Sequence, residues 1–256
     1  MRDSQINSWV EISRSALLHN VLEFKGKVLK DSKFMAVVKS NAYGHGMAEV
    51  SKVIQGKVDW FGVANLDEAF RLREVNIRKP ILVLSYYFLN RKDIEKAIKW
   101  NISLVVFRIG QLKFIKKEAG RLKKKAKVHL KVDVGTSRIG FVEKDIDKVI
   151  KFLIASPEIK VEGVMSHFSS SEENSKLTRS QLERYEKYLN EFIKQRIEPE
   201  YKHIACSAAS LVNDKNHKDL ARVGISLYGI WPFKKAKKIS KIVKLNPVLS
   251  WKTKVI

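Results

Sequence analysis

A lysine that follows an apolar run is the residue best placed for covalent chemistry in this sequence. Lys39 comes directly after the run at residues 34–38 and opens the segment KSNAYGHG at residues 39–46. A lysine on the floor of a dry pocket can lose its proton and condense with an aldehyde. The glycine-rich turn that follows, which enters a helix near Met47, offers backbone N–H groups to an anion. Pyridoxal phosphate carries both an aldehyde and a phosphate, so this segment predicts a site for it.

Polar residues also follow the later apolar runs of the chain. In chain order they are Asn65, Asp133 with Arg138, His167 and Ser207, and Arg222 stands at the entry of the last run, with Gly224 after it. Each one alone has an ordinary structural explanation, because a lone histidine or a lysine after a strand is most often a hydrogen-bonded or solvated group. We expect the set as a whole to converge on one mouth of a barrel, where active sites of such folds lie.

The elements that would position these residues form an alternating pattern. Eight short apolar runs predict strands, at residues 34–38, 60–64, 81–84, 102–107, 128–132, 161–165, 203–205 and 223–228. Most are continuous rather than alternating, which is typical of parallel strands buried on both faces. Charged amphipathic segments between them predict helices, among them residues 66–75, 93–100, 145–153 and 177–195. The pattern favours an α/β fold, a (β/α)8 TIM-type barrel. An open doubly wound sheet is the alternative, but no Gly-x-Gly-x-x-Gly follows any run.

Two further segments lie outside the eight predicted strands. Residues 9–12 and 248–256 each predict a strand, and Ser13 predicts the N-cap of a first helix at residues 13–29. We expect residues 1–12 to be a strand of a second domain, residues 13–240 to be the barrel, and residues 241–256 to be a linker and the first strand of that second, β-rich domain. Both outer strands are expected to be unpaired and therefore to promote association.

The charge of the chain is strongly positive. Its 256 residues include 50 Lys and Arg against 27 Asp and Glu, a formal net charge of +23. Two lysine-rich clusters, residues 116–127 and 234–244, lack interleaved aromatic residues, so we interpret them as solvated surface. An RNA-associated protein is the alternative that rests on charge alone. The single cysteine, Cys206, excludes an intramolecular disulfide, and no apolar run is long enough to span a membrane. The composition predicts a cytoplasmic protein without a metal, a specific nucleic acid or a membrane partner.

Several segments together resemble one enzyme family. The segment AVVKSNAYGHG at residues 36–46 is similar to the cofactor-binding signature of alanine racemases, with Ser40 in place of their usual alanine. Further segments match in order and spacing: GVANLDEA (62–69), HLKVD (129–133) with RIG (138–140), SHF (166–168), SAA (207–209) and RVGISLYG (222–229). The resemblance implies a fold type III enzyme that uses pyridoxal 5′-phosphate. It also implies alanine as the substrate, D-alanine supply for peptidoglycan as the role, and a homodimer.

The resemblance assigns roles to the residues nearest the cofactor's aldehyde and phosphate. Lys39 resembles the lysine that binds the aldehyde and serves as base for the α-proton of the D-isomer. Tyr43, Ser207 and the backbone of Gly224 and Ile225 resemble the phosphate ligands.

The resemblance assigns the remaining roles around the ring and the substrate. Arg222 resembles the arginine that donates to the pyridine nitrogen, and His167 the residue that ties this arginine into its network. Because an arginine does not give up its proton, the ring nitrogen would stay neutral. Arg138 resembles the arginine near the cofactor's phenolate oxygen and the substrate carboxylate. Lys131 matches a lysine that is often carbamylated, and Leu84 the apolar contact to the ring.

The sequence also departs from the family's pattern. Residues 134–137 read VGTS, where the family usually has threonine first and methionine third, and Cys206 stands where it has asparagine. Racemisation needs a base on each face of the carbanion, and the family's second base is a tyrosine of a Gly-Tyr-Ala-Asp-Gly segment in the C-terminal domain of the other subunit. That motif does not occur in these 256 residues, so we expect an N-terminal fragment with half of a racemase site. The alternatives are a non-catalytic pyridoxal-phosphate-binding barrel and a racemase of another small amino acid.

Overall fold

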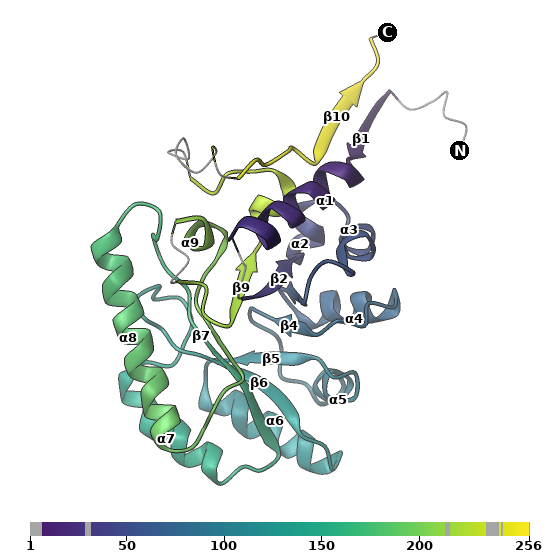
Figure 1. Cartoon of the computed structure of the whole chain (residues 1–256). Helices are drawn as coiled ribbons and strands as arrows, with labels where there is room; N and C mark the ends of the chain where they lie inside the picture. The colour runs from purple at the N-terminus through teal and green to yellow at the C-terminus, as the bar shows by residue number, and fades with distance from the viewer. Residues whose placement is uncertain (1–6, 29–31, 213–215, 234–240, 242, 256) are drawn as a thin grey trace.

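Eight parallel strands follow one another around a nearly closed barrel (Figure 1). The strands are β2 (Lys33–Val37), β3 (Trp60–Val63), β4 (Ile81–Val83), β5 (Ser103–Val106), β6 (Ala126–Lys131), β7 (Ile159–Met165), β8 (Tyr201–His203) and β9 (Leu220–Val223). The hydrogen-bonded order runs from β8 back to β2 and then to β9. Arg222 N donates to Ala205 O at 3.2 Å, which brings β9 to the end of β8. The predicted TIM-type barrel is confirmed. This computed structural model describes residues 7–28, 32–212, 216–233, 241 and 243–255.

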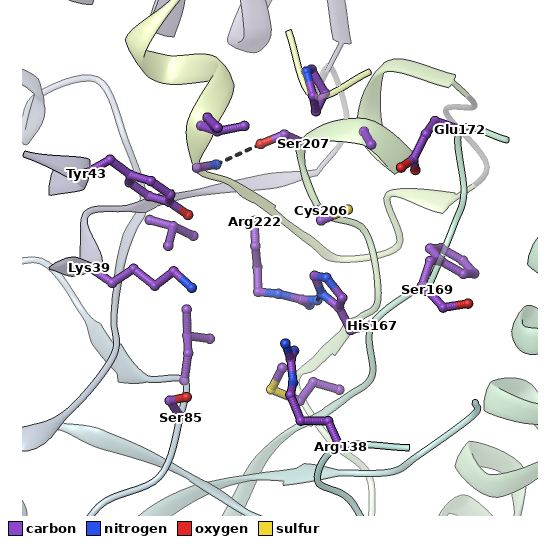
Figure 2. Close-up of a pocket in the computed structure, with 18 of the residues that line it drawn as sticks. Lys39, Tyr43, Ser85, Arg138, His167, Ser169, Glu172, Cys206, Ser207 and Arg222 are labelled. Carbon is purple, nitrogen blue, oxygen red and sulfur yellow. Dashed lines mark hydrogen bonds between the residues drawn. The ribbon is translucent and has the colours of Figure 1, made fainter. Parts of the chain in front are cut away.

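Helices lie on the outer side of the strands, and the loops after the strands meet around one pocket (Figures 1 and 2). The α-helices are α1 (Arg14–Glu23), α2 (Lys39–Tyr43), α3 (Met47–Ile54), α4 (Leu66–Glu74), α5 (Arg91–Lys99), α6 (Ile109–Arg121), α7 (Glu143–Ile154), α8 (Ser175–Lys194) and α9 (Ser207–Val212). Four of them begin at a side chain that accepts a bond from a free backbone N–H. Those N-caps are Ser13, Asn65, Asn90 and Asn174. The predicted cap at Ser13 is therefore confirmed.

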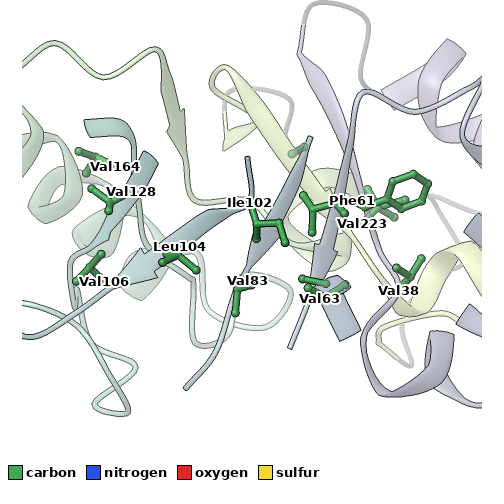
Figure 3. Packing of buried hydrophobic residues seen from close by; sticks show 14 of the residues in the cluster. Val38, Phe61, Val63, Val83, Ile102, Leu104, Val106, Val128, Val164 and Val223 are labelled. Carbon is green, nitrogen blue, oxygen red and sulfur yellow. The ribbon is translucent and has the colours of Figure 1, made fainter. Parts of the chain in front are cut away.

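The core has two parts because the strands are buried on both faces. Along β2, Met35 and Val37 point into the barrel, whereas Phe34 and Ala36 pack toward the helices. The inner part contains Met35, Val37, Trp60, Leu82, Val105, Phe107, Met165 and Leu220. The larger outer part lies between strands and helices, and Figure 3 shows its valines and leucines along successive strands. This double burial explains the continuous apolar runs in the sequence.

One predicted strand was wrong, and the first helix changes type along its length. The run at residues 223–228 is not a strand: β9 ends at Val223, and Ile225–Tyr228 forms a 3-10 helix. The run is apolar because it covers the end of the barrel, where the Tyr228 ring packs 5.4 Å from the ring of Tyr43. The first helix is α-helical only to Glu23 and continues as a π-helical turn, Phe24–Val28. Residues 234–240, most of the second lysine-rich cluster, lie outside the described residues.

The two outer strands pair with each other, which corrects the expectation that they would be unpaired. β1 (Ser8–Ile12) and β10 (Leu249–Thr253) form an antiparallel ribbon in the register Ser8↔Thr253 to Ile12↔Leu249. Ser13 N donates to Val248 O at 2.8 Å, which brings the two segments together. The ribbon projects away from the barrel (Figure 1), and the Trp251 side chain is 78% exposed. In the part of the chain that the structure describes, no helix is both long enough and apolar enough to cross a membrane.

Candidate active site

A cavity of about 390 Å³ opens at the C-terminal ends of the barrel strands. All ten site residues predicted from the sequence line it: Lys39, Tyr43, Leu84, Lys131, Arg138, His167, Ser207, Arg222, Gly224 and Ile225. Figure 2 shows Lys39, Arg138 and Arg222 reaching into the same space from the start of α2, the loop after β6 and β9. The sequence prediction that these residues converge on one mouth is therefore correct, although their individual roles stay predictions.

A left-handed turn places Lys39 and Tyr43. Ser40, Asn41, Ala42 and Tyr43 all have φ between 52° and 55°, and Gly44 follows at 90°. Side chains of L-residues clash with the following carbonyl in this conformation, at a cost of about 1–2 kcal/mol per residue. The turn reverses the chain tightly enough that the Lys39 ammonium lies 5.9 Å from the centre of the Tyr43 ring.

Two side chains hold this strained turn. Glu68, at the start of α4, accepts from the backbone N–H of Ser40 at 2.6 Å and from that of Ala64 at 2.7 Å. Asn41 accepts from the N–H of Met47 at 2.9 Å, which joins the turn to the first residue of α3. The Glu68 carboxylate thus links the end of β3 to the turn after β2. This structural contact accounts for Glu68 in the family-like segment 62–69 without giving it a role in the cavity.

Tyr43, Ser207 and Gly224 form a polar cradle at one end of the cavity. The Gly224 N–H donates to the Ser207 hydroxyl at 2.9 Å. A Cβ on Gly224 would lie 2.7 Å from the Tyr43 hydroxyl oxygen, so only glycine leaves this hydroxyl its place. Two hydroxyls and a glycine backbone gathered in this way suit the oxygens of a phosphate. The cradle and Lys39 together fit pyridoxal phosphate, whose aldehyde and phosphate-bearing methylene stand on adjacent ring carbons, because the Lys39 ammonium lies 5.9 Å from the centre of the Tyr43 ring.

Arg222 crosses the inside of the barrel to reach the cavity. Its Nη2 donates to the backbone oxygens of Ser166 at 2.7 Å and Ile204 at 3.0 Å, and to His167 Nδ1 at 3.3 Å. Its Nη1 donates to His203 Nδ1 at 2.7 Å. Burial lowers the pKa of Arg222 to about 10, so the guanidinium keeps its charge at neutral pH.

His167 is neutral beside this arginine. Burial, followed by the charges of Arg222 and Lys131, lowers the pKa of His167 to about 3. Because Arg222 can only donate, His167 Nδ1 accepts and its proton is on Nε2. The ring therefore steadies the guanidinium without adding a second charge.

Lys131 and Arg138 face each other at the other side of the cavity. The loop that carries Arg138 is folded around Asp133, whose Oδ1 accepts from the backbone N–H groups of Gly135 and Thr136 at 2.9 Å each. Lys131 is buried at the end of β6. Burial and then the charge of Arg138 lower the pKa of Lys131 to about 8.

Two polar residues at strand ends do not reach the cavity. Asn65 caps α4, and Asp133 holds its own loop, so the expectation that they join the mouth was wrong. The reason is that short polar side chains bind nearby backbone N–H groups first. The cavity also has lining residues to which the sequence reasoning gave no role: Val37, Ser85, Met165, Phe168, Ser169, Glu172, Cys206, Ala208 and Pro232. The sequence analysis also gave no role to His203, which accepts a hydrogen bond from Arg222. The sequence feature that could have indicated such a role is a polar residue at the start of the apolar run 203–205.

Comparison with known proteins gives the site its family. The family model described as "Alanine racemase, N-terminal domain" matches residues 12–232. The chain belongs to the alanine racemase family. Among curated relatives, alanine racemase 1 of Oceanobacillus iheyensis is 35% identical over 255 residues, covering 98% of this chain and 66% of the relative. The alanine racemase of Methanococcus maripaludis is 36% identical over 250 residues, covering 96% of this chain and 66% of the relative.

Solved alanine racemases have the same fold as this chain. An alanine racemase of Clostridium difficile 630, in complex with cycloserine, superposes with a TM-score of 0.91 at 31% identity. The match covers 98% of this chain and 69% of that one. The chain spans 63% to 66% of the length of the first three curated relatives. The family model, which matches residues 12–232, covers all eight strands of the barrel.

Proposed function

We propose that this chain is the cofactor-binding barrel of a pyridoxal-phosphate-dependent alanine racemase. The observation that carries the proposal is the meeting of Lys39, Arg222 and the Tyr43–Ser207–Gly224 cradle in one cavity, in a chain of the alanine racemase family. When bound, pyridoxal phosphate supplies an electron sink that makes the α-proton of an amino acid removable. D-alanine supply for peptidoglycan, a homodimer and a cytoplasmic location are proposed on the family resemblance alone.

Lys39 holds the cofactor aldehyde and moves the α-proton. Its ammonium lies on the cavity side of β2, beside Tyr43. As the free amine, Lys39 accepts the proton from one face of Cα, the face of the D-isomer. The Lys39 ammonium so formed exchanges its protons with solvent, and return of a solvent-derived proton to the same face gives exchange without inversion.

The cradle anchors the phosphate, and Leu84 covers the ring. The hydroxyls of Tyr43 and Ser207 donate hydrogen bonds to phosphate oxygens, and the backbone N–H of Ile225 is a third donor. Hydrogen bonds to a charged group contribute about 1.5–3 kcal/mol each. Leu84 supports the proposal because it is an apolar side chain of the same cavity.

Arg222 donates to the ring nitrogen and keeps its own proton. A buried guanidinium with a pKa of about 10 remains a donor at neutral pH. The neutral ring nitrogen that results is a weaker electron sink, which favours return of a proton to Cα over longer-lived side reactions.

Arg138 orients the substrate carboxylate. It is exposed on its loop and lines the cavity opposite Lys39, so a small amino acid between them would meet a cation at its carboxylate end. Alanine is the substrate that the family suggests. The carboxylate of serine or another small amino acid could bind Arg138 in the same way.

Reductive labelling tests the proposal. The chain is incubated with pyridoxal phosphate, reduced with borohydride and digested, and the labelled peptide is mapped. We expect the label on Lys39, its loss in Lys39→Ala, and its retention in Lys131→Met, which removes the other lysine of the cavity. A label on Lys131, or no label on folded protein, contradicts the proposal.

A further inference from the structure

Arg222 is a buried cation that contacts no carboxylate among the residues that the structure describes. Its hydrogen-bond partners among the described residues are two histidines and two backbone oxygens. A buried charge needs compensation, because burial removes its water. From Arg222 a chain of hydrogen bonds leads away from the cavity, through His203 and into the barrel.

A line of hydrogen bonds continues from His203 to a buried carboxylate. His203 Nε2 and His129 Nδ1 lie 2.8 Å apart, and His129 Nε2 lies 3.3 Å from Glu162 Oε2. Ser103 donates to the same Glu162 oxygen at 2.5 Å. The four residues come from β5, β6, β7 and β8, and all are buried, the two histidines completely.

The barrel leaves space for this line. Gly163 follows Glu162 on β7, and a Cβ at Gly163 would overlap the His129 ring. The Tyr201 ring stacks on His129, with 6.3 Å between centres and 11° between planes. The Trp60 ring makes an edge contact with His129 at 5.6 Å between centres. The imidazole is therefore held in one orientation by its neighbours.

The donors and acceptors of the line run in one direction. Arg222 can only donate, so His203 Nδ1 accepts and His203 Nε2 carries the proton. His129 Nδ1 then accepts a hydrogen bond from His203. The proton of His129 is therefore on Nε2, and this N–H donates a hydrogen bond to Glu162. A carboxylate can only accept, so both ends of the line demand the same two tautomers.

The histidines transmit this arrangement without being charged. Burial, followed by the charge of Arg222, lowers the pKa of His203 well below its usual value, and burial lowers that of His129. Burial acts to raise the pKa of Glu162, but the bonds from His129 and Ser103 outweigh it and hold this pKa at about 2. The charged and titratable groups around the two rings are Glu162, Glu200, Arg222 and Tyr201.

We propose that Glu162 is a positioning residue for Arg222 and acts through His129 and His203. Together with Arg222 it fixes the tautomers in which His203 accepts from Nη1, and it supplies the negative charge that matches the guanidinium. The opposite face of Arg222 is then held toward the cavity. That Arg222 acts on a cofactor in the cavity rests on the proposed function. The donor-to-acceptor direction from Arg222 to Glu162 does not.

Lys127 provides the matched control. Its ammonium contacts the other Glu162 oxygen, Oε1, at 3.2 Å from a partly exposed position. Lys127→Met removes an ion pair of the same carboxylate but leaves the line of donors intact. Glu162→Gln keeps the shape of the side chain, removes the charge, and offers a donor as well as an acceptor to His129.

Nitrogen-15 NMR of the histidine rings tests the direction of the line, without any cofactor. In the wild-type chain at pH 7.5 we expect His129 and His203 to be neutral, with the proton on Nε2. In Glu162→Gln we expect His129 to lose this single tautomer, and in Lys127→Met to keep it. A proton on Nδ1 of either ring in the wild type, or unchanged tautomers in folded Glu162→Gln, overturns the proposal.

Pyridoxal phosphate labelled with nitrogen-15 in its ring tests the effect on Arg222. We expect Glu162→Gln to shift the ring-nitrogen signal and to raise the dissociation constant by roughly tenfold, the usual scale for a residue that acts through another. Lys127→Met should leave both unchanged. Equal effects of the two variants would mean that Glu162 acts on stability alone, and overturn the proposal. Failure of the wild type to bind the cofactor would contradict the proposed function, while the histidine spectra still decide the direction of the line.

Discussion

Lys131 is surrounded by positive charge at the edge of the cavity. Arg138 and Arg222 both lower its pKa, after burial, to about 8, and Asp133 is the acid that opposes them. A neutral lysine amine can add to carbon dioxide and release a proton, which leaves a carbamate anion. This change would replace a repulsion with an attraction to Arg138, so the surroundings of Lys131 favour the carbamate that the family resemblance implies.

We therefore predict that Lys131 carries a carbamate when carbon dioxide is present. Only the neutral amine reacts, so at a fixed concentration of dissolved carbon dioxide the carbamate should increase as pH rises through about 8, the pKa of Lys131. Carbon-13 NMR with labelled carbon dioxide measures it. The signal should be absent in Lys131→Met, and its persistence in that variant would assign it to another lysine.

The residues of the cavity were largely predictable because ordered motifs identified them. Lys39, Arg138 and His167 each follow a predicted strand end, where active-site residues of a barrel lie. Arg222 precedes the predicted strand 223–228, so the motif alone identified it. Glu162 was not predictable, because alternation along a run buried on both faces does not say which side chains face inward. Only the pairing of β6 with β7 brings it to His129.

At the scale of elements, the left-handed turn after β2 is the strained part of the site. Four successive residues without the freedom of glycine adopt positive φ, and the bonds from Glu68 and Asn41 hold them there. Strain of this kind persists only where the surroundings fix it. The exposed side chain of Ser40 allows the strain to be tested without disturbing the cavity.

We predict that Ser40→Gly stabilises the chain by about 0.5–1 kcal/mol. Glycine removes a left-handed penalty of about 1–2 kcal/mol, and its greater freedom in the unfolded chain offsets about 0.5–1 kcal/mol of that. Ser40→Val, a β-branched residue at the same φ of 53°, should instead destabilise it by about 1 kcal/mol or more. Urea unfolding gives both free energies, and a Ser40→Gly chain less stable than the wild type would contradict the prediction.

Element types were more predictable than their ends and partners. The strands of the barrel follow from continuous apolar runs, but an apolar run such as residues 223–228 can equally be a buried 3-10 turn. The pairing of β1 with β10 joins segments from opposite ends of the chain, and no local pattern specifies such a partner. The bond from Ser13 to Val248, which brings them together, depends on the folded barrel.

At the scale of the whole molecule, the barrel and the ribbon differ in how much they bury. The barrel has a continuous core on both sides of its strands, whereas β1 and β10 leave most of their side chains exposed. An isolated two-stranded ribbon is marginally stable in water. We propose that the ribbon belongs to a second, β-rich unit, as the sequence reading expected, while the cavity depends on the barrel alone.

Proton transfer at the substrate Cα is the activity that tests the whole cavity. Of the titratable groups that the structure describes around the cavity, Tyr43 belongs to the cradle, His167 is bound to Arg222, and Arg138 helps to lower the pKa of Lys131. Cys206 and Glu172 also line the cavity, but neither has an amine that could hold an aldehyde. Lys39 is therefore the group that we propose for Cα, and it serves one face. Racemisation needs a second group on the other face, and a single general acid or base contributes about 10²- to 10⁴-fold to a rate.

We predict that these 256 residues, loaded with pyridoxal phosphate, exchange the α-hydrogen of D-alanine with solvent deuterium at least about 100-fold faster than they racemise it. Proton NMR follows the loss of the α-proton signal, and chiral chromatography follows the appearance of L-alanine in the same sample. Lys39→Ala should lose both activities to the level of free cofactor, whereas Lys127→Met, far from the cavity, should lose neither. Equal rates of exchange and racemisation would mean that a second proton-transfer group already lies within these residues, with Cys206 and Glu172 as the cavity side chains to substitute next.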